Sequence, residues 1–341
     1  MSEPEIAVFG AGSVGCYLGG RLLATGANVH FIGRARIAAE VAAHGLHCTD
    51  LHGADHRVAP GIARFSEDPD SVRSADVVLV TVKSAATDVA ARELAGRLKP
   101  GALVISFQNG LRNADVLRAG LPGVTVLTGM VPFNVLARGQ GRFHHGSDGV
   151  LASEYHPALK DLGLIEVFGR SGLVLICHAD MRAVQWGKLL LNLNNAVNAL
   201  SGVPLKEELS QRGFRRCLAA AQAETLALLD AANIPVAQLT KVPPHWLPRL
   251  LSLPDFLFTR LAKQMVAIDP LARSSTWEDL EAGRATEVDY INGAVVKLAE
   301  SMGWQAPVNA TLVALIRDAE RGGRRDWTAR ELHAALEAAA R

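Results

Sequence analysis

The first half of the chain alternates short β-branched apolar runs with segments of helical periodicity, and glycines separate many of them. This alternation is typical of βαβ units on a parallel sheet. The segment from Arg138 to about His178 is expected to add further strands and turns to the same domain. Five strands are predicted before it: Ile6 to Gly10, Val29 to Ile32, Val77 to Thr81, Ala102 to Ser106 and Val124 to Gly129.

The second half has a different pattern. From Asp180 onward, long Ala- and Leu-rich stretches with helical spacing replace the short strands, beginning with an apolar helix over residues 181–200. The end of the chain, Thr328 to Arg341, is either one more surface helix or a frayed segment. Further helices are predicted at Phe214 to Ala232, Trp246 to Ala267, Ser275 to Ala282, Glu287 to Met302 and Ala306 to Arg321.

This change of pattern predicts two domains. A chain of 341 residues, 49% of them hydrophobic, is long enough to bury two cores. We expect an α/β domain over residues 1–179, an all-α domain over residues 180–325, and a C-terminal tail over residues 326–341 that can be helical. Amphipathic helices in the second domain leave two alternatives open, a homodimer interface or core packing alone.

Composition excludes several classes of partner. The net charge is +1 and no basic stretch carries interleaved aromatics, so neither nucleic acid nor an anionic membrane surface is an expected partner. The four cysteines lack any metal-ligand spacing, which indicates reduced thiols, with neither a disulfide nor a structural metal. No apolar run approaches the roughly 18 residues that span a bilayer, and no leader pattern opens the chain. The expected location is the cytoplasm.

A glycine-rich turn lies directly after the first predicted strand and before a helix. Its glycines allow a tight turn, close approach of the backbone to a pyrophosphate, and close packing of helix on strand. The helix that follows offers unpaired N–H donors at its first turn. The turn therefore predicts a Rossmann-type dinucleotide site, the alternative being a structural glycine turn. Its residues are Gly10, Ala11, Gly12, Ser13, Val14 and Gly15.

The end of the second strand indicates which dinucleotide binds. An NAD site usually places Asp or Glu about 20 residues after the glycine turn, where the carboxylate accepts from the ribose hydroxyls. Here the strand reads VHFIGRAR, with no acid at its end and with Arg34 in that place. A guanidinium suits a 2′-phosphate, so we expect NADP. The alternative is that the arginines of this segment merely begin an exposed helix.

Two further strand ends point to the same edge of the sheet. Lys83 follows VVLVTV, and Asn109 follows LVISF within a Gln-Asn-Gly turn. Open α/β sheets bind ligands outside the carboxyl ends of their strands. Position therefore favours a role for Asn109 near the nicotinamide, although Asn-Gly is also an ordinary turn signal.

Three polar residues interrupt the apolar helix over residues 181–200. Lys188, Asn192 and Asn195 lie at i, i+4 and i+7, on one face, where polar groups need partners or a ligand. A partly buried lysine with a lowered pKa can donate the proton that carbonyl reduction requires, and the two amides can orient a carbonyl or carboxylate. The alternative is a lysine that extends to water.

Near the end of the chain, Ser275 and Thr286 each begin the spacing of a helix capping box, STWE and TEVD. Capping alone is one explanation for both residues. Glu287 has a similar alternative explanation as an acid in the first turn of a helix.

With these residues in place, the chain resembles the ketopantoate reductase family from the GAGSVG turn through TVK, QNG and WGKLLLN to TEVDYING and MGWQAPVN. The resemblance implies an NADPH-dependent reduction of a 2-oxo acid, in a cleft between a Rossmann domain and an all-helical domain. It assigns Lys188 as general acid and Glu287 as its acidic partner. By the same resemblance Asn109 touches cofactor and substrate, Asn192 and Ser275 bind substrate, and Arg34 and Lys83 bind NADPH.

The chain departs from the family pattern on the substrate side. Where pantoate-forming members usually carry asparagines, it has Ala196, Lys206 and Ala272. Ketopantoate is the substrate that the family implies, and another branched or bulkier 2-oxo acid is the enzymatic alternative. A protein that binds NADPH without turnover is an alternative of another class, which the presence of both Lys188 and Glu287 disfavours.

Overall fold

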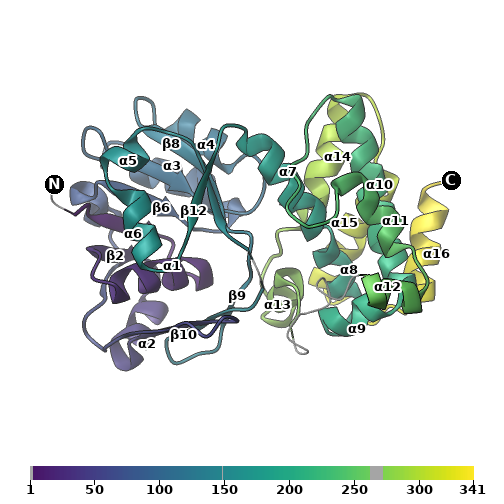
Figure 1. The fold of residues 1–341 in the computed structure, drawn as a ribbon, viewed down its shortest axis with the longest axis horizontal. Helices are drawn as coiled ribbons and strands as arrows, with labels where there is room; N and C mark the ends of the chain where they lie inside the picture. Colours follow the sequence, from purple (N-terminus) through teal and green to yellow (C-terminus); the bar gives the residue numbers. More distant parts are fainter. Residues whose placement is uncertain (1–2, 148, 262–271) are drawn as a thin grey trace. The chain divides into compact units, whose positions relative to one another are not determined.

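The computed structural model describes residues 3–147, 149–261 and 272–341. By its internal contacts the chain divides into two compact units, Met1–Met181 and Arg182–Arg341. Figure 1 draws the first unit in purple to teal and the second in green to yellow. None of the helices in the described residues is long and apolar enough to cross a membrane.

The first unit is an α/β domain around a largely parallel sheet. Its central strands confirm the five predicted ones to within about a residue at most ends. Their apolar, β-branched sequences suit strands that are covered on both faces. They are β1 (Ile6–Phe9), β2 (Val29–Ile32), β6 (Val77–Val80), β7 (Leu103–Ser106) and β8 (Thr125–Met130).

The full sheet has eight strands in the order β12-β11-β8-β7-β6-β1-β2-β5. β5 (Arg64–Ser66) continues the parallel set beside β2, whereas β11 (Leu151–Glu154) runs antiparallel to β8 and β12 (Leu175–His178) forms the other edge. The reversal of strand order on either side of β1 creates the crevice at which open α/β sheets bind ligands.

A second, four-stranded sheet has the order β4-β3-β10-β9. Together with β5, every strand of this sheet except β10 was absent from the prediction, because these segments are short and most carry polar residues instead of apolar runs. The strands are β3 (Leu46–Asp50), β4 (Asp55–Val58), β9 (Val135–Ala137) and β10 (Arg142–His145).

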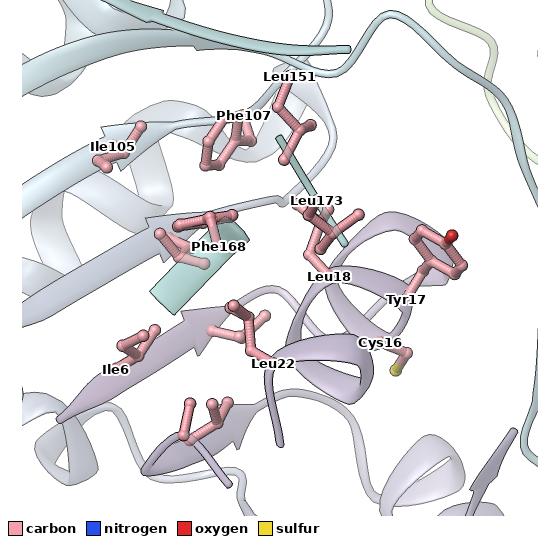
Figure 2. Packing of buried hydrophobic residues seen from close by; sticks show 14 of the residues in the cluster. Ile6, Cys16, Tyr17, Leu18, Leu22, Ile105, Phe107, Leu151, Phe168 and Leu173 are labelled. Atoms are coloured by element: carbon pink, nitrogen blue, oxygen red, sulfur yellow. The ribbon is translucent and has the colours of Figure 1, made fainter. Parts of the chain in front are cut away.

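Each face of the large sheet has its own core, because successive strand residues point to opposite faces. Ile6 and Val8 belong to the core under α1 (Ser13–Ala24) and α6 (Leu164–Arg170), which Figure 2 shows with Leu18, Leu22 and Phe168. Ala7 and Phe9 belong to the other core, under α3 (Thr87–Leu94) and α4 (Asn113–Gly120). Both cores hold β1 rigidly beneath the glycine turn that follows it.

The expectation of only strands and turns between Arg138 and His178 is wrong in part. β10, β11 and β12 lie in this segment, but α5 (Ala158–Asp161) and α6 separate the last two strands. In α6, Leu164, Val167 and Phe168 are buried at helical spacing. That short periodicity was overlooked among the glycines that flank it.

The second unit is all-helical. The predicted helices over residues 181–200, 214–232, 275–282 and 306–321 are confirmed, the first as two helices, and α9 (Leu205–Ser210) is an addition. The helices that confirm these predictions are α7 (Met181–Asn192), α8 (Asn194–Ser201), α10 (Arg212–Ala231), α13 (Ser275–Glu281) and α15 (Pro307–Glu320).

The C-terminal tail is the helix α16 (Ala329–Ala339). Thr328 and Glu331 form a capping box at its start, and Leu332 and Leu336 are buried on its inner face. α16 packs against α10 and α15, so residues 326–341 are an ordered part of the second unit.

Two helix predictions need correction. The continuous helix from Trp246 to Ala267 is instead η3 (Pro244–Trp246), α11 (Leu247–Leu251) and α12 (Asp255–Leu261), and its last six residues lie outside the described residues. Pro254 breaks it, since proline lacks an N–H and disfavours helical geometry at the residue before it. The helix predicted from Glu287 begins later, as η4 (Val288–Tyr290) followed by α14 (Asn292–Ser301).

Candidate active site

The glycine turn after β1 has a backbone that larger residues would disrupt. Gly10 has φ +109°, and a Cβ there would lie 2.6 Å from the Val82 nitrogen. A Cβ on Gly15 would lie 2.5 Å from the Gly10 oxygen and 2.6 Å from Thr81 Oγ1, which donates to that same oxygen. These two glycines are therefore required by the fold of the turn.

Gly12 differs from its neighbours. A Cβ there would meet only the Gly10 oxygen, at 4.0 Å, so the space above Gly12 is open. Gly12 is also the N-cap of α1, and no side chain caps that helix. Open space above a helix N-terminus whose first amides lack a side-chain acceptor matches the chemistry of a pyrophosphate. The turn thus fits the dinucleotide predicted from Gly10, Ala11, Gly12, Ser13, Val14 and Gly15.

The end of β2 lies beside this turn. A Cβ on Gly33 would come within 2.6 Å of the Ala11 Cβ, so only glycine allows the two segments to approach this closely. Arg34 follows as the exposed N-cap of α2 (Ala35–His44). A cation and a helix N-terminus together suit a phosphate. Gly33 was not predicted as a site residue, although its place between the strand and Arg34 was a signal for close approach.

The ends of β6 and β7 are joined by hydrogen bonds between polar side chains and backbone. Lys83 is the N-cap of η2 (Ser84–Ala86). The Asn109 carbonyl accepts from Ser84 Oγ at 2.7 Å and from Asn113 Nδ2, so the Gln-Asn-Gly turn is fixed next to Lys83. Sequence reasoning missed Ser84 and Asn113. The signal for Ser84 was its position next to Lys83 after a predicted strand, whereas Asn113 begins α4 and had no such signal.

In the second unit, Lys188 is half-buried on α7. Burial lowers its pKa from the ordinary 10.5 to about 8, and the charge of Glu287 opposes that shift. Two segments about 100 residues apart therefore bring an ammonium and a carboxylate into interaction. A lysine with a pKa near 8 can hold a proton at neutral pH and release it readily, as a general acid must.

Hydrogen bonds on both sides fix the position of Glu287. The Thr286 hydroxyl and amide both donate to Glu320 Oε1 at 2.8 Å, and Arg317 bridges Glu320 to Asp289. The capping box expected at Thr286 is wrong, since Glu287 is the N-cap of η4 and the Thr286 hydroxyl accepts from the Val288 amide, at 3.3 Å, and not from the Asp289 amide that a capping box requires. Glu287 is consequently held at a bend in the chain and not within the first turn of a helix.

The predicted polar face of residues 181–200 spans two helices. Asn192 is the last residue of α7 and Asn195 lies in α8, yet the Leu193 amide still donates to the Leu189 oxygen at 3.0 Å. Lys188, Asn192 and Asn195 are all half-buried, whereas three of the four leucines between them, Leu189, Leu190 and Leu193, are buried. One partly exposed polar stripe thus runs along this segment.

Asn195 and Ser275 come together although 80 residues separate them in sequence, with Asn195 Nδ2 lying 3.4 Å from Ser275 Oγ. The predicted cap at Ser275 is wrong by one residue. Ser274 is the N-cap of α13, accepting from the Trp277 amide at 3.2 Å, and its hydroxyl also donates to the Asn195 oxygen at 3.1 Å. The Ser275 hydroxyl is therefore not used to cap α13.

A buried carboxyl lies behind this pair. Glu208 is fully buried, and Asn198 Nδ2 donates to its Oε2 at 2.8 Å. Asn198 Oδ1 in turn accepts from the Ser274 amide at 2.8 Å. Burial raises the pKa of Glu208 to about 8, which favours the neutral acid. Neither Asn198 nor Glu208 was predicted, since no local pattern links residues this far apart.

The structure offers no sign of a metal centre within the ranges it describes, where no three His, Cys, Asp or Glu side chains form a group that could hold an ion. The candidate site residues of the second unit are two amides, one hydroxyl, one lysine and one acid, a set that suits an oxygen-rich organic anion.

Comparisons with known proteins give the same division of the chain. The family model "Ketopantoate reductase PanE/ApbA" matches residues 6–157, and the model of that family's C-terminal region matches residues 180–320. A 2-dehydropantoate 2-reductase of Halobacterium salinarum is 30% identical over 324 residues, which cover 94% of this chain and all of that protein.

Solved structures share the fold. A PanE/ApbA family ketopantoate reductase of Ralstonia eutropha JMP134 superposes with a TM-score of 0.78 at 30% identity, covering 93% of this chain and 99% of that one. A D-mandelate dehydrogenase with NADH and anilino(oxo)acetate reaches a TM-score of 0.75 at 19% identity, with the same coverage, and is similar in fold alone.

Proposed function

The chain belongs to the ketopantoate reductase family, and from this we propose that it reduces 2-dehydropantoate (ketopantoate) to pantoate with NADPH, a step of pantothenate biosynthesis. The observation that carries the proposal is the half-buried Lys188, whose pKa is lowered to about 8 and which interacts with Glu287. The substrate is inferred from the relatives, and the type of reaction is inferred from the residues of this chain.

NADPH, when bound, supplies the hydride. The proposal assigns the pyrophosphate to the amides at the start of α1 and to the open space above Gly12. Arg34 holds the 2′-phosphate, with Lys83 as a second cation. Asn109, whose carbonyl is fixed by Ser84, presents its amide to the nicotinamide and the substrate.

Lys188 is the proposed proton donor to the alkoxide that forms at C2 of the 2-oxo acid. Its lowered pKa matches the general-acid role, because the protonated form persists at neutral pH while transfer of its proton is less costly than from an ordinary lysine. Glu287 is proposed to keep the ammonium charged and oriented, since its carboxylate raises the lysine pKa against the effect of burial.

The remaining polar residues of the second unit are assigned to the substrate. Asn192 and Asn195 are proposed to orient its carboxylate and carbonyl, and Ser275 to donate from a hydroxyl that does not cap α13. These groups are proposed to orient the substrate, and this orientation raises the rate only when the substrate is bound in the reactive geometry.

A second candidate is reduction of another 2-oxo acid. Ala196, Lys206 and Ala272 replace asparagines that pantoate-forming relatives usually carry, and this difference favours a substrate of other shape. The loss of these asparagines would alter the selectivity among 2-oxo acids, whereas Lys188 and Glu287 are both retained.

Following NADPH absorbance with ketopantoate and a panel of other 2-oxo acids tests the function. Efficient turnover of ketopantoate supports the proposal, and preference for another acid replaces it with the second candidate. Tight NADPH binding without oxidation of any acid would overturn both and favour a sensor.

Location and assembly belong to the same proposal. Four free cysteines accord with a reducing compartment, so we place the protein in the cytoplasm. Exposed Trp246, Phe256 and Leu261 on the surface of the second unit favour a homodimer, which light scattering of the purified protein tests.

A further inference from the structure

An acid that follows a neighbouring strand caps the helix that begins at the proposed 2′-phosphate site. Glu67 Oε1 accepts from the Ala35 amide at 2.8 Å, although 32 residues separate them. Ala35 is the first residue of α2, and its N-cap, Arg34, provides no side-chain cap of its own. Glu67 therefore supplies the acceptor that α2 would otherwise lack.

The sheet places Glu67 there. It directly follows β5, which pairs in parallel with β2, and the Gly33 amide donates to the Ser66 oxygen at 3.0 Å. The carboxyl ends of β2 and β5 thus lie side by side. Gly33 in turn lies against Ala11 of the glycine turn, so this exposed carboxylate stands at the nucleotide end of the sheet.

A 2′-phosphate bound by Arg34 would meet this carboxylate. The phosphate carries nearly two negative charges at neutral pH and prefers helix N-terminal amides. Glu67 already holds the first of those amides and adds a like charge beside it. NADH has no phosphate at this position, so neither the competition nor the repulsion applies to it.

We propose that Glu67 is a specificity-determining residue that weakens NADPH binding relative to NADH, by competing with the 2′-phosphate for the Ala35 amide and by repelling it. This inference rests on the cofactor site of the proposed function. Arg34 attracts the phosphate and Glu67 opposes it, and selectivity commonly arises from such a pair of attractive and repulsive elements. The preference of the site for NADPH over NADH is then the difference between this attraction and this repulsion.

The test compares Glu67→Gln with Asp68→Asn. Glutamine keeps an oxygen that accepts from Ala35 and removes the charge. Asp68 is the matched control, because it is also exposed, lies one residue further, and directs its carboxylate to the Asp70 amide at the start of η1 (Pro69–Ser74). Dissociation constants of NADPH and NADH are measured by calorimetry at low and high salt.

The expected result is that Glu67→Gln tightens NADPH by about three- to tenfold at low salt while NADH changes less than about twofold. The gain shrinks at high salt because the repulsion is screened. Asp68→Asn leaves the ratio of the two constants within about twofold of the unmodified protein.

An unchanged ratio in Glu67→Gln, or an equal change in Asp68→Asn, would overturn the role of Glu67 and leave the cofactor site standing. Absence of binding of either dinucleotide to the unmodified protein would instead overturn the cofactor site, and this inference with it. The two failures are therefore distinguishable in one set of titrations.

Discussion

The two units build their candidate site regions in different ways. In the first, the nucleotide end consists mainly of backbone: a turn in which Gly10 and Gly15 leave no room for a side chain, and the N-terminus of α1. In the second, the proposed substrate end consists of side chains from α7, α8, α13 and the residue before η4, and long-range hydrogen bonds link α8 to α13. A backbone site is specified locally, whereas a side-chain site depends on the packing of the whole unit.

The largest expected effect is at the chemical end. Lys188→Ala should lower kcat by about 10²- to 10⁴-fold, because the forming alkoxide loses its proton donor. The dissociation constant of NADPH should stay within about twofold, since the cofactor is assigned to the other unit. Steady-state kinetics and calorimetry check both values. Lys297→Ala, an exposed lysine on α14, is the control and should leave kcat unchanged; equal losses in both variants would remove Lys188 from its role.

The next largest effect distinguishes two glycines of the same turn, one required for cofactor binding alone and one also required for stability. Gly12→Ala should fold normally, because its Cβ has 4.0 Å of clearance, yet weaken NADPH by about 10- to 100-fold by entering the phosphate space. Gly15→Ala should lose both cofactor affinity and stability, because its Cβ would lie 2.5 Å from the Gly10 oxygen. Calorimetry and thermal unfolding distinguish them. Normal NADPH affinity in Gly12→Ala would contradict the assignment of that space.

Adjacent serines offer a smaller contrast in the second unit. Ser274→Ala removes the cap of α13 and should lower the free energy of unfolding by about 1–2 kcal/mol. Ser275→Ala should change stability by less than about 0.5 kcal/mol but raise the KM for the 2-oxo acid by about three- to tenfold. Denaturant unfolding and kinetics of both variants check this. The reverse assignment of the two effects would show that Ser275 serves the helix and not the substrate.

The last contrast concerns Glu208 and the pH dependence of stability. Its pKa is raised from the ordinary 4.5 to about 8, so the native state holds a proton that the unfolded chain has lost across this range. The native state binds more protons there, and stability therefore falls as pH rises from about 5 to about 8. Glu208→Gln should flatten this slope of Tm against pH. Glu207→Gln, an exposed neighbour on α9, should retain it, and the same slope in all three proteins would contradict a buried neutral acid.

Sequence alone predicted the fold class because it depends on local signals. The strands around β1 are short apolar runs between glycines, and the long helices have clear periodicity. β3, β4, β5 and β9 were missed because they are short and most of them are polar, and the helix predicted from Trp246 was broken by Pro254. A single proline within a long helical pattern, or a strand of only three residues, gives too weak a sequence signal to be recognised.

The site shows the same limit. The local sequence pointed to the glycine turn, Arg34 and Lys188, because each differs in residue type from the apolar segment beside it. Local spacing also placed the cap of α13 at Ser275, whereas the structure has it at Ser274, whose second partner in α8 lies 79 residues earlier. Asn198 and Glu208 were invisible for the same reason, since only the folded unit brings them together.

The pH dependence of ketopantoate reduction tests most directly whether Lys188 donates the proton. The pKa of Lys188 lies near 8, and the protonated form is the acid, so kcat/KM should be level below this pH and fall about tenfold per pH unit above it. Oxidation of pantoate should show the opposite trend, since it needs the neutral amine. A reduction rate that stays level or rises between about pH 7 and about pH 10 would contradict the account.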